Sequence, residues 1–250
     1  MSFPKPGDSV PNPISSSIET GRRRGLFQSV GRMRRHLQPE LLDAEGVSDE
    51  DLSRAYRELR VLHYWLGNTA AVLRTLRKPL AAGRVLDIGC GHGALLEEIQ
   101  RKMGLDVLGI DLRPAPITAT VPIVTGNAVS DPLPRANVAV SVVMAHHLSE
   151  AEVVSLIRNV AQSCDRFILL DLVRHPVPLG LFKLFVTPFL CRINAQDGQT
   201  SIRRAFTALE LGKIVEHALA GVDRPVRRLL HTVSPLWIRQ VVDISWAPVD

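Results

Sequence analysis

One short segment constrains the fold of this chain more than any other, residues 85–93, which read Val-Leu-Asp-Ile-Gly-Cys-Gly-His-Gly. An apolar run leads into three glycines within five positions, and a helical pattern follows. Apolar runs of this length predict a buried strand, and glycine lets the backbone turn sharply and approach a ligand closely. The segment therefore predicts a strand, a ligand-binding loop and a helix, in that order.

The chain after residue 83 alternates short apolar runs with helical stretches. We expect strands at 84–88, 107–111, 122–124, 137–144 and 167–173, with helices at 94–102 and 150–163. Nearly continuous apolar strands that alternate with helices indicate a parallel sheet covered on both faces. Two further apolar runs, 226–233 and 237–246, flank Ser234-Pro235 and predict an antiparallel pair that closes the sheet.

Polar side chains lie at or just after the ends of three successive predicted strands. Asp87 would repel a phosphate and suits a ligand that carries an ammonium or sulfonium group. Asp111 can accept hydrogen bonds from both hydroxyls of a ribose. Asn127 can accept from an adenine amino group while the Ala128 N–H faces a ring nitrogen. Each of the three polar residues also has an ordinary structural interpretation. Asp87 can cap a turn, Asp111 can be a solvated charge at a strand end, and Asn127 can form an Asx turn.

These motifs resemble those of class I S-adenosylmethionine-dependent methyltransferases. VLDIGCGHG matches the first motif of that family, GID the second, GNA the third and VAVSVVMAHHL the fourth, over about residues 80 to 246. The resemblance implies an α/β, Rossmann-like fold with a seven-stranded, mostly parallel sheet and an antiparallel final hairpin. The family usually has Asp where Asn127 stands, and Asn keeps an acceptor oxygen.

The resemblance also implies a cofactor and its contacts. The cofactor is S-adenosylmethionine, and the matching positions are Asp87, Gly89, Cys90, Gly91, Asp111, Leu112, Asn127, Ala128 and Met144. Methyl transfer from a sulfonium is an in-line displacement, so the protein mainly binds, orients and excludes water.

His146 and His147 directly follow the fourth predicted strand, where open α/β sheets bind ligands. We expect at least one of them to act on the substrate, as a base for a weakly ionised phenol or as a hydrogen-bond partner, and we favour His147. The alternative is that one histidine caps the helix beginning near Ser149. The three cysteines form no CxxC pair, so we expect no metal site and a cytoplasmic location.

The chain divides into three parts. Residues 1–36 form a basic arm, expected to be disordered, whose seven basic and two acidic residues account for the whole net charge of +5. Residues 37–80 form a helical cap, and 81–250 form the methyltransferase domain. Within it, 176–205 is expected to be an apolar lid insertion, with a turn at Asp197-Gly198.

The expected acceptor is a hydrophobic small molecule, methylated at a phenolic or other hydroxyl oxygen. The chain also resembles a bacterial subgroup associated with phenolic polyketide-type molecules of secondary metabolism. Two alternatives stay open, C-methylation of a quinone-type ring and a non-catalytic cofactor-binding adaptor whose arm contacts RNA or membrane. Residues 144–147 lack the motif of base-amine enzymes and aromatic content is 5%, which argues against nucleic acid as the substrate. Peripheral membrane contact stays open as an alternative, and the oligomeric state is not predicted.

Overall fold

The computed structural model describes residues 33–43, 47–77, 83–116 and 119–248. Residues 1–32, and with them most of the expected basic arm, lie outside this part of the chain. No helix in the described ranges combines the length and the apolar character that crossing a bilayer requires.

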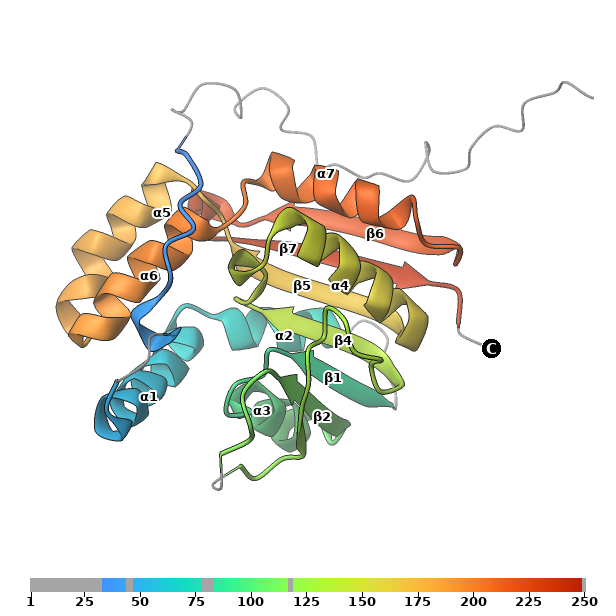
Figure 1. Cartoon of the computed structure of the whole chain (residues 1–250), viewed down its shortest axis with the longest axis horizontal. Coiled ribbons are helices and arrows are strands. Elements are labelled where there is room, and N and C mark those ends of the chain that lie inside the picture. The colour runs from blue at the N-terminus through green and yellow to red at the C-terminus, as the bar shows by residue number, and fades with distance from the viewer. Residues whose placement is uncertain (1–32, 44–46, 78–82, 117–118, 249–250) are drawn as a thin grey trace, which may run out of the picture.

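The described residues form a seven-stranded sheet in the order β3-β2-β1-β4-β5-β7-β6 (Figure 1). Its strands are β1 (Arg84–Ile88), β2 (Asp106–Asp111), β3 (Ile123–Thr125), β4 (Ala136–Val142), β5 (Cys164–Leu172), β6 (Val226–Val233) and β7 (Arg239–Trp246). The first five pair in parallel, and β7 is antiparallel to both β5 and β6. The predicted α/β fold with a reversed final hairpin is therefore confirmed.

The final strand begins two residues later than predicted. Pro235–Trp237 form a short 3-10 turn, with Leu236 and Trp237 at φ values of 59° and 52°. Left-handed backbone cannot continue a strand, so β7 starts only at Arg239.

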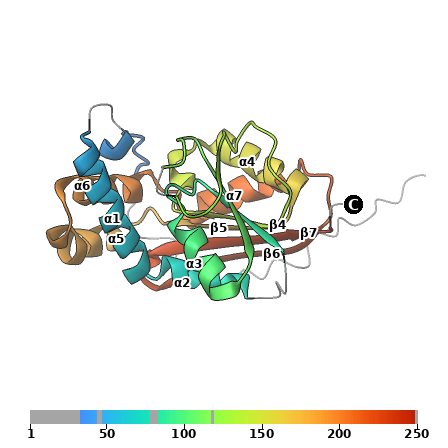
Figure 2. The ribbon, with the colours of Figure 1, turned by 90° about the horizontal axis from the view of Figure 1, so that it is seen from below.

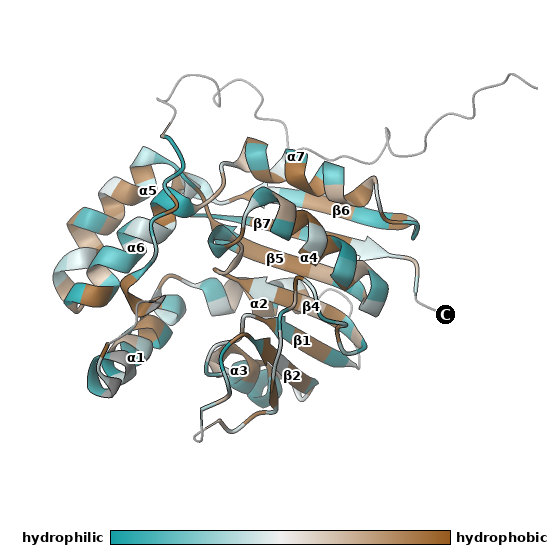
Figure 3. Cartoon of the chain, in the orientation of Figure 1, coloured by the Kyte–Doolittle hydropathy of each residue, from teal (hydrophilic) through white to brown (hydrophobic). Residues whose placement is uncertain are grey.

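Helices cover both faces of the sheet. They are α2 (Asn68–Leu76) and α3 (Ala94–Met103) on one face, and α4 (Glu150–Ser163) and α7 (Ala208–Leu219) on the other. Because side chains alternate along a strand, Val85 packs toward the first pair of helices and Leu86 toward the second. Figure 3 shows the hydrophobic residues concentrated along the central strands.

Capping boxes begin α4 and α7, as predicted by a Ser or Thr that is followed three residues later by Glu. Glu152 N donates to Ser149 Oγ at 3.2 Å, and Ser149 N donates to the Glu152 carboxylate at 2.7 Å. Thr207 and Glu210 repeat the arrangement. The cap of α4 is therefore Ser149 itself, and neither preceding histidine is needed for it.

The predicted cap and lid form one unit beside the sheet (Figures 1 and 2). It contains α1 (Asp49–Trp65), α5 (Pro176–Leu181) and α6 (Arg192–Arg204). Glu58 on α1 accepts hydrogen bonds from Cys191 N at 2.8 Å and from Asn194 Nδ2 at 3.0 Å. These contacts join two segments that are more than 130 residues apart in sequence.

The expected turn at Asp197-Gly198 is wrong, because both residues lie inside α6. The Asp197 carboxylate accepts from Leu41 N at 2.7 Å and Leu42 N at 2.9 Å, so it holds the cap segment instead. Gly198 faces Phe182 so closely that a Cβ there would lie 2.2 Å from the ring. Tertiary contacts thus override the local turn preference.

Residues 33–36, which the sequence assigns to the solvated arm, pack against the domain. Arg35 Nη2 donates to Leu148 O at 2.8 Å, and its guanidinium lies 3.7 Å from the Phe206 ring centroid. His36 N donates to Arg203 O at 3.2 Å. This end of the expected arm is therefore part of the folded structure.

Candidate active site

The glycine loop at the end of β1 has the conformation that its residues require. Gly89 and Gly91 have φ values of 71° and 53°, a region that favours glycine. A Cβ on Gly89 would lie 2.5 Å from Met144 Cγ, whereas a Cβ on Gly91 would meet nothing within 4 Å. Gly89 N is held by Ile110 O at 2.8 Å. The loop therefore packs against the rest of the protein at Gly89, whereas the space next to Gly91 is open.

Asp111 at the end of β2 binds the tip of this loop. Its Oδ2 accepts from Gly91 N at 2.8 Å, and its Oδ1 accepts from Arg113 N at 3.0 Å. Each carboxylate oxygen retains a further lone pair that a ligand hydroxyl can use. The predicted ribose acceptor therefore lies directly beside the glycine loop.

Replacing Asp111 by alanine should weaken cofactor binding by about 1–3 kcal/mol, because hydroxyl bonds to a charged acceptor are lost. Isothermal titration calorimetry measures the change. Asp106→Ala, at the other end of the same strand, is the matched control and should leave the affinity unchanged. Equal affinities for wild type and Asp111→Ala would refute the ribose assignment.

Asp87 is buried within β1 and faces the same loop. Burial, together with the negative charge of Asp111, raises the pKa of Asp87 to about 8. The free protein therefore keeps this carboxyl mostly protonated at neutral pH. A bound cation favours the ionised form, so ligand binding should displace the proton.

We expect cationic cofactor binding at pH 7 to release up to one proton from Asp87, and the release to vanish above pH 9. The sign follows from the raised pKa, because only below about pH 8 is there a proton to displace. Titration calorimetry in buffers of different ionisation enthalpy counts the protons. The Asp87→Asn protein corrects for protons from the ligand, and equal proton counts in both proteins would contradict the expectation.

Asn127 forms an Asx turn, which is the structural alternative to a role in ligand binding. Its Oδ1 accepts from Val129 N at 3.0 Å, and its own N–H donates to Asp131 at 2.8 Å. The side-chain oxygen keeps one lone pair for an adenine amino group. Ala128 is buried next to it, and Leu112 is 69% exposed beyond β2.

The side chains of Cys90 and Met144 are turned toward the protein. A Cβ on Gly109 would lie 2.5 Å from Cys90 Sγ, so this thiol packs over β2. Burial raises the pKa of Cys90, which keeps the thiol neutral. The thiol of Cys90 therefore packs against β2, and the side chain of Met144 packs against Gly89.

A pocket of about 930 Å³ lies between α1 and the glycine loop. It brings together four of the predicted residues, Asp87, Gly89, Cys90 and Gly91, with α1 side chains that include Leu59, Tyr64 and Trp65. The other predicted residues do not line it, namely Asp111, Leu112, Asn127, Ala128, Met144, His146 and His147. The sequence predicted α1 as a cap but did not identify which of its side chains face the loop.

The cap contacts the glycine loop through Tyr56 of α1. Its ring stacks on His92 with centroids 4.0 Å apart. Arg113 donates from Nη1 to Tyr56 Oη at 2.7 Å and from Nη2 to Leu42 O at 3.1 Å. The loop that carries the first motif is therefore bound directly to the cap.

His63 also lines the pocket and was not singled out from the sequence. Burial, with a smaller effect from His146, lowers the pKa of His63 to about 4. Its Nδ1 lies 3.3 Å from Asn68 Nδ2. A neutral imidazole that accepts from Asn68 presents an Nε2–H donor.

His146 is fully buried and bound to Asp171. Its backbone N–H donates to Asp171 Oδ2 at 2.7 Å, and its Nδ1 lies 2.8 Å from Oδ1. Burial alone would lower the pKa of His146, but Asp171 and Glu40 raise it to about 9. His146 is therefore placed to position its neighbours rather than to touch a substrate.

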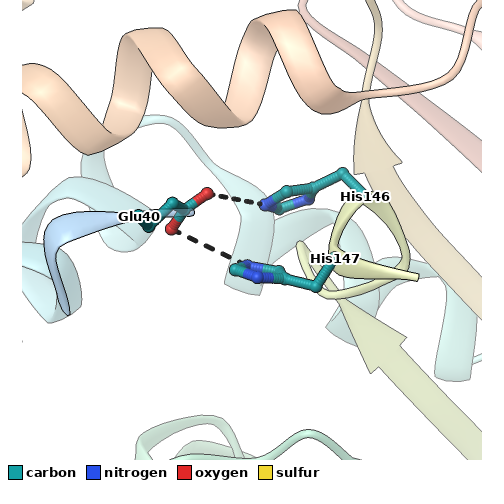
Figure 4. A group of neighbouring side chains, drawn as sticks. All are labelled: Glu40, His146 and His147. Atoms are coloured by element: carbon teal, nitrogen blue, oxygen red, sulfur yellow. Dashed lines mark ion pairs between the residues drawn. The ribbon is translucent and has the colours of Figure 1, made fainter. Parts of the chain in front are cut away.

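His147 is the more accessible member of the pair, with 31% of its side chain exposed. Its Nε2 lies 3.7 Å from Glu40 Oε2, and His146 Nε2 lies 3.5 Å from Glu40 Oε1 (Figure 4). Glu40 is buried and accepts from Ser201 Oγ at 2.6 Å. Burial raises the pKa of Glu40, but the bonds and charges of the histidines outweigh it and lower the pKa overall.

Comparison with known proteins gives two matches in sequence. Residues 54–171 match a family model described as a methyltransferase domain. The chain is also 31% identical over 178 residues to the ubiquinone biosynthesis O-methyltransferase of Psychrobacter cryohalolentis. That match covers 71% of this chain, and the chain spans 64% of the relative's length.

Solved structures match in fold. The plantazolicin methyltransferase BpumL, crystallised with S-adenosylhomocysteine, gives a TM-score of 0.58 at 12% identity, covering 79% of this chain and 89% of that one. Human N-acetylserotonin methyltransferase, crystallised with S-adenosylmethionine, gives 0.54 at 16% identity, covering 87% and 64%. Residues 54–171 are therefore similar to a methyltransferase domain, and the fold of the chain resembles that of these solved methyltransferases.

Proposed function

We propose that this chain transfers the methyl group of S-adenosylmethionine to an oxygen of a hydrophobic small molecule. The observation that carries the proposal is the pocket shared by the glycine loop and the aromatic face of α1. A pocket of about 930 Å³ is within the range of ligand-binding cavities, at its upper end. It lies next to the residues proposed to hold the cofactor and offers an acceptor space beside the glycine loop.

The residues beside the loop fit the cofactor. Asp87 supplies a buried carboxylate for the ammonium of the methionine part. Asp111 supplies acceptors for the ribose hydroxyls, and Asn127 one for the adenine amino group. Gly91 leaves the space into which the nucleoside fits.

The acceptor end of the pocket supports an amphipathic aromatic substrate. Leu59, Tyr64 and Trp65 provide apolar surface on α1, and Arg57 and Glu98 add charge. The lining is therefore mixed, with apolar and charged side chains together. An aromatic acceptor with a polar substituent can contact both the apolar and the charged side chains of the pocket.

In the proposed reaction, a lone pair of the acceptor oxygen forms the bond to the methyl carbon. The carbon–sulfur bond breaks as its electrons pass to the sulfonium, and the acceptor releases its proton. The protein orients the two reactants and excludes water. The name of the curated relative, an O-methyltransferase, supports oxygen over carbon as the acceptor atom.

Transfer of a labelled methyl group from S-adenosylmethionine to a panel of phenols, catechols and quinones tests the proposal. We expect an O-methyl product, identified by the carbon shift of the new methyl group. A new carbon–methyl bond on a quinone ring would favour the alternative enzyme. Label found only in RNA or protein would contradict small-molecule methylation.

We further propose that the acceptor reaches beyond the pocket to His147, so His147→Ala should lower turnover by roughly tenfold, the effect of one lost hydrogen bond to the acceptor oxygen. Cofactor affinity should not change, because the residues proposed to hold the cofactor lie at or near the ends of β1, β2 and β3, whereas His147 follows β4. Single-turnover rates and calorimetry separate the two effects. His217→Ala, an exposed histidine of α7, is the control. Unchanged turnover of His147→Ala would remove this residue from the acceptor site.

A further inference from the structure

We propose that Glu40, His146 and His147 form a binding site for a divalent transition metal of the zinc type. Their ligand atoms all lie within 4.8 Å of one another. Figure 4 shows both imidazole rings turned toward the two oxygens of the Glu40 carboxylate. This cluster differs from the sequence expectation, which included no metal.

The separations in the cluster are close enough for the three groups to bind one ion. His146 Nε2 lies 3.5 Å from Oε1 of Glu40 and His147 Nε2 lies 3.7 Å from Oε2, and both distances exceed the usual hydrogen-bond range of about 2.7–3.2 Å. The same groups make short bonds elsewhere, 2.8 Å from His146 to Asp171 and 2.6 Å from Ser201 to Glu40. Tetrahedral zinc with bonds of about 2.0–2.1 Å holds its ligand atoms about 3.4 Å apart.

Hydrogen bonds from neighbouring residues hold the three ligand residues in place, as is usual around metal sites. Asp171 occupies Nδ1 of His146, which leaves Nε2 directed at Glu40. A carboxylate behind a ligating histidine sets its tautomer and orientation. Ser201 holds Glu40, and Arg204 Nη2 donates to the backbone oxygen of His147 at 3.3 Å.

A ligand set of two imidazoles and one carboxylate favours some metal ions over others. Nitrogen ligands suit Zn²⁺ and other first-row transition metals, whereas Mg²⁺ and Ca²⁺ prefer all-oxygen sites. The side chain of His147 is 31% exposed, so an ion can reach the cluster from this side. Binding of an acceptor oxygen to that ion rests on the proposed function, but metal binding itself does not.

Metal titration of the full chain, stripped with chelator, tests the site without any activity readout. We expect one Zn²⁺ per chain by calorimetry and visible absorption bands of four-coordinate Co²⁺. His147→Ala should weaken binding at least tenfold, and Glu40→Gln should do the same. His217→Ala should bind as the wild type does.

His147→Ala is the decisive variant because its partly exposed side chain can be removed with little effect on folding. Thermal unfolding of each metal-free variant verifies that it remains native. Absence of binding at millimolar Zn²⁺ and Co²⁺, or equal binding by wild type and folded His147→Ala, would overturn the proposal. Either result leaves methyl transfer itself untouched.

Discussion

Asp243→Ala is expected to lower the free energy of unfolding by about 3–5 kcal/mol, the cost of leaving one partner of a buried ion pair uncompensated. Asp243 on β7 binds Arg166 on β5 through two bonds, of 2.7 Å to Nε and 2.9 Å to Nη2. Both residues are buried where the antiparallel hairpin joins the parallel sheet. The carboxylate also lies 3.6 Å from Arg228, so its loss removes more than one contact.

Urea unfolding of Asp243→Ala and of Asp106→Ala provides the comparison. Asp106 pairs with Arg84 at the same distance, 2.7 Å, but both side chains are about half exposed. An exposed pair contributes about 0–1 kcal/mol, so this control should unfold nearly as the wild type does. A similar small loss in both variants would show that the β5–β7 ion pair does not hold the hairpin.

Gly91→Ala should abolish most cofactor binding, with an affinity loss of roughly a hundredfold or more. Its Cβ would enter the open side of the loop, where the nucleoside is expected, and the positive φ resists any residue other than glycine. The folded protein should lose about 1–2 kcal/mol from the left-handed conformation alone.

Gly104→Ala is the control that distinguishes the effect of backbone strain from the effect of a Cβ that fills the cofactor site. Gly104 ends α3 with a φ of 65°, and its Cβ would also meet nothing within 4 Å. The stability cost should therefore be similar, while cofactor affinity, measured by calorimetry, should stay at the wild-type value. Equal affinity losses in both variants would mean that binding responds to general destabilisation rather than to Gly91.

The parts of the fold that the sequence predicts well are local. The glycine loop, the strand-end acids and the Ser149 capping box depend on residues within a few positions of each other, so their spacing carries the information. The helix at Glu150–Ser163 and the strand at Arg84–Ile88 have the predicted bounds for the same reason.

The parts that the sequence does not reveal depend on contacts far apart in the chain. Glu40 meets His146 across 106 positions, and no periodic pattern marks Glu40 as a site residue. Asp171, like Asp111, is an acid near the end of an apolar strand, and this pattern marks it as a candidate site residue. The sequence does not reveal that His146 is its partner. Arg35 looked like one more charge of a basic arm, although it binds the backbone of His146 and Leu148.

We propose that the corner formed by Asp87, the glycine loop and Asp111 holds the cofactor. A crystal structure of the full chain with S-adenosylhomocysteine tests it most directly. We expect the ribose hydroxyls within hydrogen-bond distance of the Asp111 carboxylate and the nucleoside over Gly91. Product bound elsewhere on the protein, or no binding at saturating concentration, would contradict it.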